Sequence, residues 1–488
     1  MATKQSSHHL PLPQSSHSCS CSHHYGTGSM SSAPPTNPAT PTLSHLSLAN
    51  HGRGEPDVPE SWTLMDPVAP TCTAGFSQAY SQSSSELCIF ADLLIPGRGD
   101  PVPKAAVGIS TEDGSITYVG PQSHMPQHLW AASRTTTHPA TLGAMITRGL
   151  HDTLMAGFTS VRDVGSYATE VAPLVDSGFL LGPNIFGAGA AIGITGGSCD
   201  ACTLLGDFVA TRQGTSPLHP WPGVATLVIA DGVDECRRAV RQQIRRGARC
   251  IKVVATGGVL STADDPQYRQ YSDEELHVLM SEAQLQGRAV AIHAHGKSGI
   301  MAAVRAGAKT IEHGSYIDEE AAELMVARNV SLVATRKVIE AGLKNLDSLN
   351  PPTALKMKNI AAQHAHAYAL AIRKGVKIAL GTDISGSNPK SGTAHGKNGA
   401  ELVYAVAAGL SPLGAIEAGT INSAETLGPQ TPKKGLIKVG WDADMIALNE
   451  NPLDNIHLFA NPENIKYVWK GAMLVKSPQG QMLWPPLK

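Results

Sequence analysis

The middle of the chain alternates short apolar runs with longer segments in which apolar residues recur every three or four positions. The short runs are typical of buried strands, and the longer segments predict amphipathic helices. An alternation of strands and helices implies a parallel sheet. The seven predicted strands span 157–164, 183–193, 250–256, 289–295, 309–313, 330–336 and 376–383.

The predicted helices have recognisable ends. Ser272 begins one of them, Glu275 completes a capping box, and Gly287 ends it. Seven or eight strand–helix units over about 290 residues favour a TIM (β/α)8-type barrel over an open sheet, and such a barrel carries its site at the carboxyl ends of its strands. The other predicted helices cover 232–246, 298–307, 318–328, 353–374, 398–409 and 412–426.

The two ends of the chain differ from its middle. Short β-type runs separated by Gly, Pro and Asp occur at 86–120, 435–448 and 465–476, and they predict a small β-sandwich built from both ends. The first residues are rich in Ser, Pro, Thr and His and cannot bury enough apolar area to fold. The predicted domains are a disordered tail (1–84), a β-sandwich (85–122 plus 431–488) and the barrel (123–430).

Composition and charge argue against several classes of function. A formal net charge of −2 gives no reason to expect nucleic acid or a membrane surface as a partner. No apolar run approaches the roughly 18 residues of a transmembrane helix, and no secretory signal is present, so we expect a cytoplasmic protein. Neither a phosphate-binding GxxxxGK[ST] loop nor a GxSxG nucleophile elbow occurs. The CxxC pair Cys199 and Cys202 is interpreted as two loop thiols, with a zinc or redox site as the lesser alternative.

Four of the apolar runs deliver a polar residue of the kind that binds metals. Lys252 lies early in the run IKVVATGG, His293 ends VAIHAHG with His295 two residues on, His313 ends TIEHG, and Asp383 ends KIALGTD. Two histidines and a carboxylate on different strands suit a divalent ion such as Zn²⁺. A lysine joins such a set when its amine is carboxylated and bridges two ions. Asp383 would hold a metal or take a proton from metal-activated water.

Each of these residues alone has a simpler explanation. Lys252 would be a solvated strand residue, His313 a hydrogen-bonded core histidine, and Asp383 a helix N-cap. The alternation of side chains puts His293 and His295 on one face, so one of them could contact substrate instead. Found together at strand ends of one barrel, the four residues favour a metal site. His364 and His366 also have HxH spacing, but they fall within a predicted helix and are interpreted as packing or surface residues.

From about Gly143 to its end, the chain resembles the metal-dependent amidohydrolase superfamily, in particular its imidazolonepropionase-like and Xaa-Pro dipeptidase branch and the fungal ochratoxinases. The resemblance implies a TIM barrel flanked by a β-sandwich, a carboxylated bridging Lys252, a second metal bound by His293 and His313, and Asp383 as ligand and general base. It also implies that His295 and Arg336 face the substrate. The matching stretches are GFTSVRDVG, IKVVATGGVLS, AIHAHGKSGIMAAVRAG, IEHGSYIDEE, LVATR, IALGTD and GWDADMIALNENPLDNI.

The chain departs from this family pattern in two places. The family's PGLxDxHxH segment, which carries the first barrel strand and two histidine ligands, is absent between residues 120 and 143, where His124, His128 and His138 lack that spacing. The family's GGHG reads Gly-Gly-Ser-Cys at 196–199. The barrel is therefore expected to lack its first strand, and the first of one or two zinc positions to be incomplete.

The predicted function is the metal-dependent hydrolysis of an amide C–N bond in a small, dipeptide-like substrate, with metal-activated water as the nucleophile. Three alternatives stay open: an impaired or inactive relative that retains partial metal binding, a truncated gene model whose true product is active, and a mononuclear enzyme. A homo-oligomer also stays open.

Overall fold

The parallel sheet predicted by the apolar runs is present in the computed structural model, which describes residues 86–94, 101–110, 116–121, 139–200, 227–261, 264–386 and 390–482. Six strands are hydrogen-bonded in the order β11-β10-β9-β8-β6-β7, and every described pairing within this sheet is parallel. The strands are β6 (Ala191–Gly193), β7 (Leu227–Ile229), β8 (Cys250–Val254), β9 (Ala289–Ala294), β10 (Thr310–His313) and β11 (Ser331–Val333).

The earlier part of the predicted barrel is divided differently. β4 (Ser160–Asp163) pairs in parallel with β5 (Asn184–Gly187) in a separate two-stranded sheet. The predicted strand 183–193 is split into β5 and β6 around Gly189, whose φ of 70° interrupts the extended backbone. β7 was not predicted. The run 376–383 contributes a single parallel bridge, from Ile378 to Leu332. Closure of these strands into a complete barrel stays a prediction.

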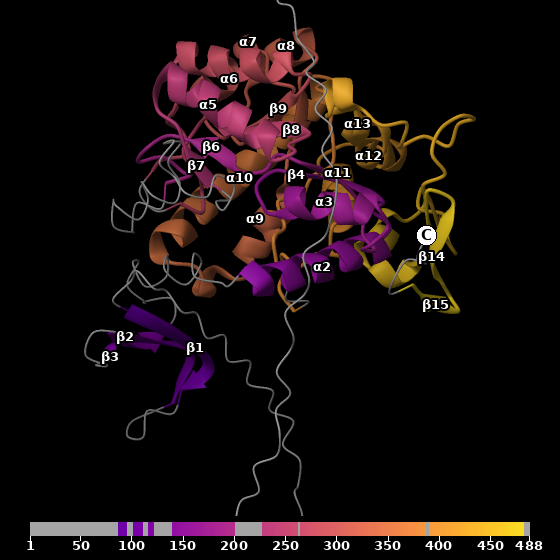
Figure 1. The fold of residues 1–488 in the computed structure, drawn as a ribbon, viewed down its shortest axis with the longest axis horizontal. Coiled ribbons are helices and arrows are strands. Elements are labelled where there is room, and N and C mark those ends of the chain that lie inside the picture. Colours follow the sequence, from indigo (N-terminus) through magenta and orange to yellow (C-terminus); the bar gives the residue numbers. More distant parts are fainter. Residues whose placement is uncertain are drawn as a thin grey trace, which may run out of the picture. The chain divides into compact units, whose positions relative to one another are not determined.

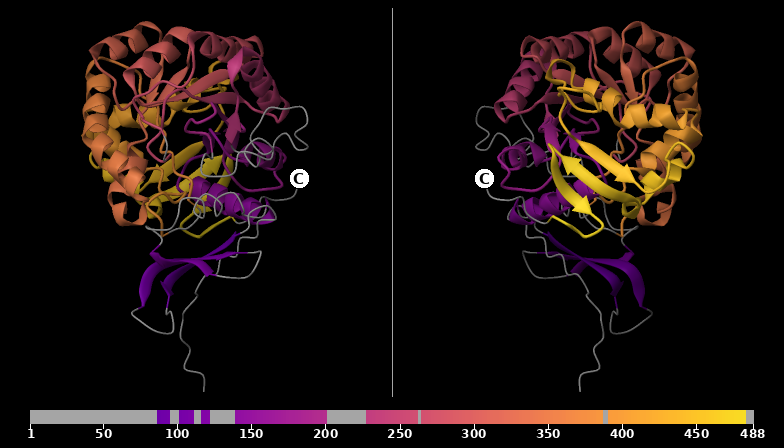
Figure 2. Two further views of the ribbon diagram at one scale, coloured as in Figure 1. Left: turned by 90° about the vertical axis from the view of Figure 1, so that its left-hand side faces the viewer. Right: turned by 90° about the vertical axis from the view of Figure 1, so that its right-hand side faces the viewer.

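The helices between the strands follow their predicted ends closely. They are α5 (Gly232–Arg245), α6 (Asp273–Leu285), α7 (Lys297–Ala306) and α8 (Glu319–Ala327). Ser272 and Glu275 form the reciprocal capping box that was predicted. α7 begins one residue earlier than expected because Gly296 is its N-cap, and Gly307 ends it in the left-handed conformation. In Figures 1 and 2 these helices lie side by side on the outer side of β8 to β11.

Further helices precede and follow the six-stranded sheet. The long predicted helix 353–374 is confirmed as α10 (Pro351–Arg373), and the predicted pair after residue 398 becomes three shorter helices. The remaining helices of the described ranges are α2 (Pro139–Met155), α3 (Ala168–Asp176), α9 (Arg336–Leu343), α11 (Ala400–Ala407), α12 (Pro412–Gly419), α13 (Ile421–Glu425), and the 3₁₀ turns η2 (Leu346–Ser348), η3 (Gly428–Gln430), η4 (Ile456–Ala460) and η5 (Pro462–Asn464).

The strands predicted at the two ends form two antiparallel sheets. The first joins β1 (Glu86–Leu94), β2 (Val102–Ser110) and β3 (Ile116–Pro121), and the second joins β12 (Met445–Leu448), β13 (Ile465–Lys470), β14 (Met473–Ser477) and β15 (Gly480–Gln481). The predicted strand 435–448 is wrong over its first ten residues. The run 465–476 is a hairpin rather than one strand, because Gly471 and Ala472 at its centre have positive φ and form the turn. That the two sheets make one sandwich stays a prediction.

The hydrophobic core lies between the central strands and their helices. Ile251, Ile292 and Ile311 from adjacent strands are fully buried against Leu276 and Ile300 from the helices. Each such side chain stabilises the fold by about 1.5–3 kcal/mol. The helices thus hold β8, β9 and β10 in register, and with them the carboxyl ends that carry the predicted site. All described residues belong to one compact unit, 72–488; the tail predicted at 1–84 lies outside them.

No helix in the described ranges combines the length and apolar character needed to cross a bilayer.

Candidate active site

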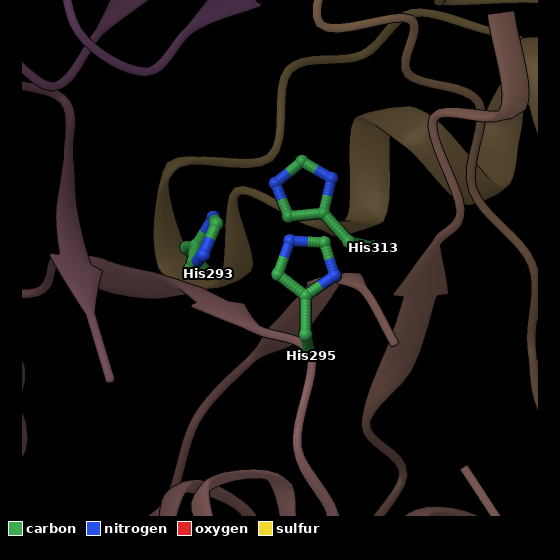
Figure 3. Close-up of side chains that lie close together, drawn as sticks. All are labelled: His293, His295 and His313. Carbon is green, nitrogen blue, oxygen red and sulfur yellow. The ribbon is translucent and has the colours of Figure 1, made fainter. Parts of the chain in front are cut away.

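Three histidines from two adjacent strands converge at the carboxyl end of the parallel sheet. His293 lies on β9, His295 directly follows it, and His313 is the last residue of β10. Their ring centroids are 4.6–4.8 Å apart; His295 and His313 are stacked at 15°, and His293 stands edge-on to both (Figure 3). One nitrogen of each ring lies within 4.8 Å of the others. This group joins His295 to the pair that was predicted to bind metal.

Neighbouring oxygen atoms orient the three rings. Nδ1 of His295 is 2.7 Å from the Ser315 hydroxyl, and Nδ1 of His313 is 2.7 Å from the Thr335 hydroxyl. Nε2 of His293 lies 3.2 Å from the carbonyl oxygen of Gly257. Each contact occupies one ring nitrogen and turns the other toward the shared space. Hydroxyl and carbonyl partners of this kind are what set the tautomer of a metal-binding histidine.

Burial keeps all three rings neutral. Desolvation, with lesser repulsion from Lys252, lowers the pKa of His293 to about 4. Desolvation and the neighbouring histidines lower the pKa of His295 and of His313 well below their usual value. Neutral imidazole is the form that binds a cation. Tetrahedral Zn²⁺ with bonds near 2.05 Å needs donor nitrogens about 3.4 Å apart. The donor atoms of the trio lie within 4.8 Å of one another, so the three rings could hold one divalent ion if they moved closer together.

His313 reaches the site because its backbone is left-handed. In the register of β9 and β10, Glu312 lies opposite His293 and His313 lies opposite Ala294. Partners in parallel strands point to the same face, so a regular strand would turn His313 away from His293. Its φ of 73° breaks the alternation and returns the ring to the trio. Asp383 and Thr335 also have positive φ, 52° and 54°. Non-glycine residues rarely adopt this conformation, and strained conformations of this kind cluster at active sites.

Lys252 lies in the middle of β8. The strand spans Cys250–Val254, so the lysine lies at its centre and not at the strand end that was expected. Lys252 is level with Ala291, two residues below His293 and on the same face. That offset is about 6.6 Å, a distance that the flexible lysine stem can span. Desolvation lowers the pKa of Lys252, which favours the neutral amine, although Glu312 and Asp383 act in the opposite direction.

An interior ion pair that the sequence did not predict lies beside Lys252. Arg162 on β4 donates to Glu312 on β10 at 2.9 Å and to the Thr310 hydroxyl at 3.1 Å. The side chains are 12% and 5% exposed for Arg162 and Glu312. The signal that could have found Glu312 is the alternation Thr310-x-Glu312, which puts both residues on the face of His293. Lys252 and Asp383 interact electrostatically with this pair, so four ionisable side chains lie next to the trio.

Asp383 follows the last run of the parallel sheet. Its side chain is exposed, so solvent reaches the carboxyl group. The surrounding protein nevertheless desolvates it enough to raise its pKa to about 6; Lys252 opposes this shift and Glu312 adds to it. A carboxyl group that ionises near pH 6 can exchange a proton with water close to neutrality.

A family model described as the amidohydrolase family matches residues 116–480. The chain belongs to the amidohydrolase family. It is 41% identical over 425 positions to ochratoxinase of Aspergillus niger, covering 80% of this chain and 86% of that protein. Eighty per cent of 488 residues is about 390, so about 35 of the 425 aligned positions have no residue of this chain opposite them.

Solved structures extend this likeness. The crystal structure of A. niger ochratoxinase matches with a TM-score of 0.68 and 40% identity, over 81% of this chain and 97% of that one. A Xaa-Pro dipeptidase with bound methionine in its active site matches with a TM-score of 0.59 and 28% identity, over 80% and 100%. A prolidase complexed with N-methylphosphonate-L-proline matches at 0.62 and 29%, over 79% and 97%. The likeness to these structures indicates that this amidohydrolase has a TIM-barrel-like α/β fold.

In this amidohydrolase, the loop after β8 packs closely against its own first residues and against the residues that follow β9. Gly257 and Gly296 lack a side chain where the backbone of the loop after β8 passes: an added Cβ would meet Asp265 O at 2.1 Å and Gln267 O at 2.3 Å. The glycine at 257 in the TGG sequence therefore permits close packing of the loop. Lys356 of α10 secures the same loop from the other side, by hydrogen bonds to Gly258 O, Ser261 O and Asp264.

The remaining predicted residues have other positions. Arg336 is the first residue of α9, where its guanidinium donates to Glu340 and to Ala361 O. A role in substrate binding stays a prediction. His364 is 1% exposed and packs inside the protein, as expected. Burial raises the pKa of the Cys199 thiol to about 12, which leaves it unreactive, and Cys202 lies outside the described residues. His124, His128 and His138 lie outside them too.

Proposed function

We propose that the protein is a metal-dependent hydrolase of an amide C–N bond in a small, dipeptide-like molecule. The observation that carries the proposal is the convergence of His293, His295 and His313 within 4.8 Å at the end of the parallel sheet. The names of the relatives support the substrate class, because a Xaa-Pro dipeptidase and a prolidase cleave the amide bond of a dipeptide.

His293 and His313 would hold the ion, with Lys252 and Asp383 from the neighbouring strands completing the ligand set. His295 is either a third nitrogen ligand or a group that contacts the substrate. A bound divalent ion, zinc in our proposal, would supply Lewis-acid activation of water and of the amide carbonyl. Asp383, with its pKa near 6, would accept the proton of the attacking water and pass it to the leaving nitrogen. Carboxylation of Lys252 would let it bridge two ions.

Metal content and amide hydrolysis test this proposal together. Purified protein loaded with Zn²⁺ is expected to hold at least one ion per chain and to cleave N-acyl amino acids or dipeptides, and Lys252→Ala is expected to abolish cleavage. Lys377→Ala is the matched control, because Lys377 pairs with Glu425 away from the trio. His295→Ala separates its two roles: loss of bound zinc identifies a ligand, and a raised KM with zinc retained identifies a substrate contact. Well-folded protein with neither zinc nor turnover would overturn the proposal.

A second candidate is an impaired or inactive amidohydrolase that retains partial metal binding. The absence of the PGLxDxHxH segment favours it, because that segment supplies two of the family's ligands. About 35 of the positions aligned with ochratoxinase have no residue of this chain opposite them. It predicts less than one zinc per chain, no turnover, and no loss of stability in chelator. Inserting a family PGLxDxHxH segment between residues 120 and 143 is then expected to create turnover.

A further inference from the structure

The turn between β11 and α9 has an unusual N-cap. Thr335 precedes α9 in the left-handed conformation, with φ 54° and ψ 38°, and its side chain makes no capping hydrogen bond. A threonine at this position ordinarily has extended backbone and accepts a backbone N–H of the first helical turn. The Thr335 hydroxyl instead lies 2.7 Å from Nδ1 of His313. Its hydroxyl is thus diverted from the helix to the histidine.

A carboxylate from another helix takes over the cap. Glu401, in the first turn of α11, is 1% exposed. Its two oxygens accept the backbone N–H groups of Arg336 at 2.8 Å and of Lys337 at 2.7 Å. Burial raises the pKa of Glu401 to about 7, which means that keeping its carboxylate ionised here is costly. Two short contacts to the unpaired N–H groups of a helix end are the partners that offset this cost.

The carbonyl side of the same turn is held as firmly. Buried His364 on α10 lies with its Nε2 2.7 Å from the carbonyl oxygen of Ala334. Arg336 donates to Ala361 O at 2.6 Å, which ties the start of α9 to α10. Three of the four residues 334–337 are thus bound by α10 or α11, and the fourth, Thr335, is bound by His313. These contacts together hold Thr335 in the left-handed conformation, which it would not keep alone.

We propose that Glu401 is a positioning residue for His313: by capping α9 it keeps Thr335 left-handed, and so keeps the Thr335 hydroxyl on Nδ1 of His313 and Nε2 facing the metal position. The metal part of this inference rests on the proposed function; the orientation of His313 does not. Without Glu401, the N–H groups of α9 lose their acceptor. The Thr335 hydroxyl is then the nearest replacement cap, and moving there it leaves His313 free to rotate and change tautomer.

Metal affinity is the first measurement. Zn²⁺ affinity, from competition with a chelator, is expected to fall about 10- to 100-fold in Glu401→Ala, the usual loss when an outer partner of a metal-binding histidine is removed. Thr335→Val, which removes the hydroxyl and keeps the shape, is expected to show a similar fall. The double variant is expected to be no weaker than either single variant, because both break the same connection. Glu401→Gln retains one acceptor oxygen and is expected to fall between Glu401→Ala and the wild type.

A matched control separates positioning from general destabilisation. Glu282 is also a buried carboxylate, 6% exposed, but it pairs with Arg241 on the outer helices. Glu282→Ala is expected to lower the melting temperature and leave zinc affinity unchanged. A folded Glu401→Ala protein with wild-type zinc affinity, or additive losses in the double variant with Thr335→Val, would overturn the proposal.

The tautomer of His313 gives a readout that needs no metal. In metal-free protein carrying ¹⁵N-labelled histidine, the wild type is expected to show His313 with its proton on Nδ1, which donates to the Thr335 hydroxyl. Glu401→Ala and Thr335→Val are expected to shift His313 away from that form. If the wild type binds no zinc but the tautomer shifts as expected, the proposed function fails and the positioning role stands. An unchanged tautomer in both variants removes the positioning role.

Discussion

Loss of one side chain of the buried ion pair between Arg162 and Glu312 should lower the stability of the protein strongly. The two are 2.9 Å apart, and their side chains are 12% and 5% exposed. Arg162→Met keeps most of the side-chain volume and removes the positive charge. Glu312 is then left in the interior with the Thr310 hydroxyl but without its cation. Thr310 cannot neutralise that charge, so the buried carboxylate is left without a hydrogen-bonded cation.

The expected cost follows from this burial. At an effective dielectric constant near 20, unit charges 2.9 Å apart attract by about 6 kcal/mol, most of which desolvation cancels. Removing one partner of such a pair typically costs about 3–5 kcal/mol, because the other charge stays buried. The pair Arg148 and Asp152 on α2 is the exposed control, with side chains 62% and 22% exposed. Arg148→Met should cost less than about 1 kcal/mol.

Thermal unfolding of the metal-free variants, followed by circular dichroism, measures the difference. Arg162→Met is expected to melt about 10 °C below the wild type. The double variant Arg162→Met/Glu312→Gln is expected to recover at least half of that loss, since no charge then stays unpaired. A melting temperature of Arg162→Met within 2 °C of that of Arg148→Met corresponds to a difference of about 1 kcal/mol or less in the free energy of unfolding. That result would refute the reasoning. A double variant less stable than Arg162→Met would contradict it as well.

Three further perturbations have defined outcomes. Hydrolysis is expected to rise with pH through about 6 as Asp383 ionises, and Asp383→Asn should lower the rate and abolish this step in a pH–rate profile. His364 has a folded pKa of about 4, below the usual 6.5, so its contribution to stability is present above pH 6.5 and is lost as pH falls toward 4. It amounts to at most roughly 3 kcal/mol, and urea titrations of His364→Gln should show a shallower loss over that interval. Lys356→Met removes three hydrogen bonds from the loop after β8 and should cost about 1–3 kcal/mol and raise KM. An unchanged KM there would show that the loop does not depend on this lysine.

Sequence patterns predicted the elements whose signals are local. The capping box of Ser272 and the glycine end of α7 depend on neighbouring residues and are confirmed. The strands β8 to β10 are confirmed because their apolar runs are bounded by clear turns. Where a strand depends on distant partners, the patterns gave less. Residues 435–444 have β-type composition but no strand partner in the described ranges. β7 has only three residues, too few to give a recognisable apolar pattern.

The candidate site was predicted in its residues more fully than in its geometry. His293, His313 and Lys252 were identified from their runs, but the trio with His295 depends on how two strands are registered. Glu401 could not be found from the sequence. It is 66 positions from Thr335, and nothing local marks it as the cap of another helix. Only the packing of α11 beside α9 gives that carboxylate its partners.

The left-handed residues explain why strand-end position alone was an incomplete guide. His313, Thr335 and Asp383 end three successive runs of the sheet, and each has positive φ. At His313 the regular alternation would have favoured Glu312 for the site and turned the histidine toward the helices. The sequence TIEHG thus supplies two consecutive residues that face the interior. Glu312 does so through the regular alternation of the strand, and His313 through its left-handed backbone. This conformation is unfavourable for a histidine by itself, so neighbouring groups must maintain it. The Thr335 hydroxyl, 2.7 Å from Nδ1, orients the ring of His313, and in our proposal the cap from Glu401 holds Thr335 in turn, so the orientation of this histidine depends on residues well outside its strand.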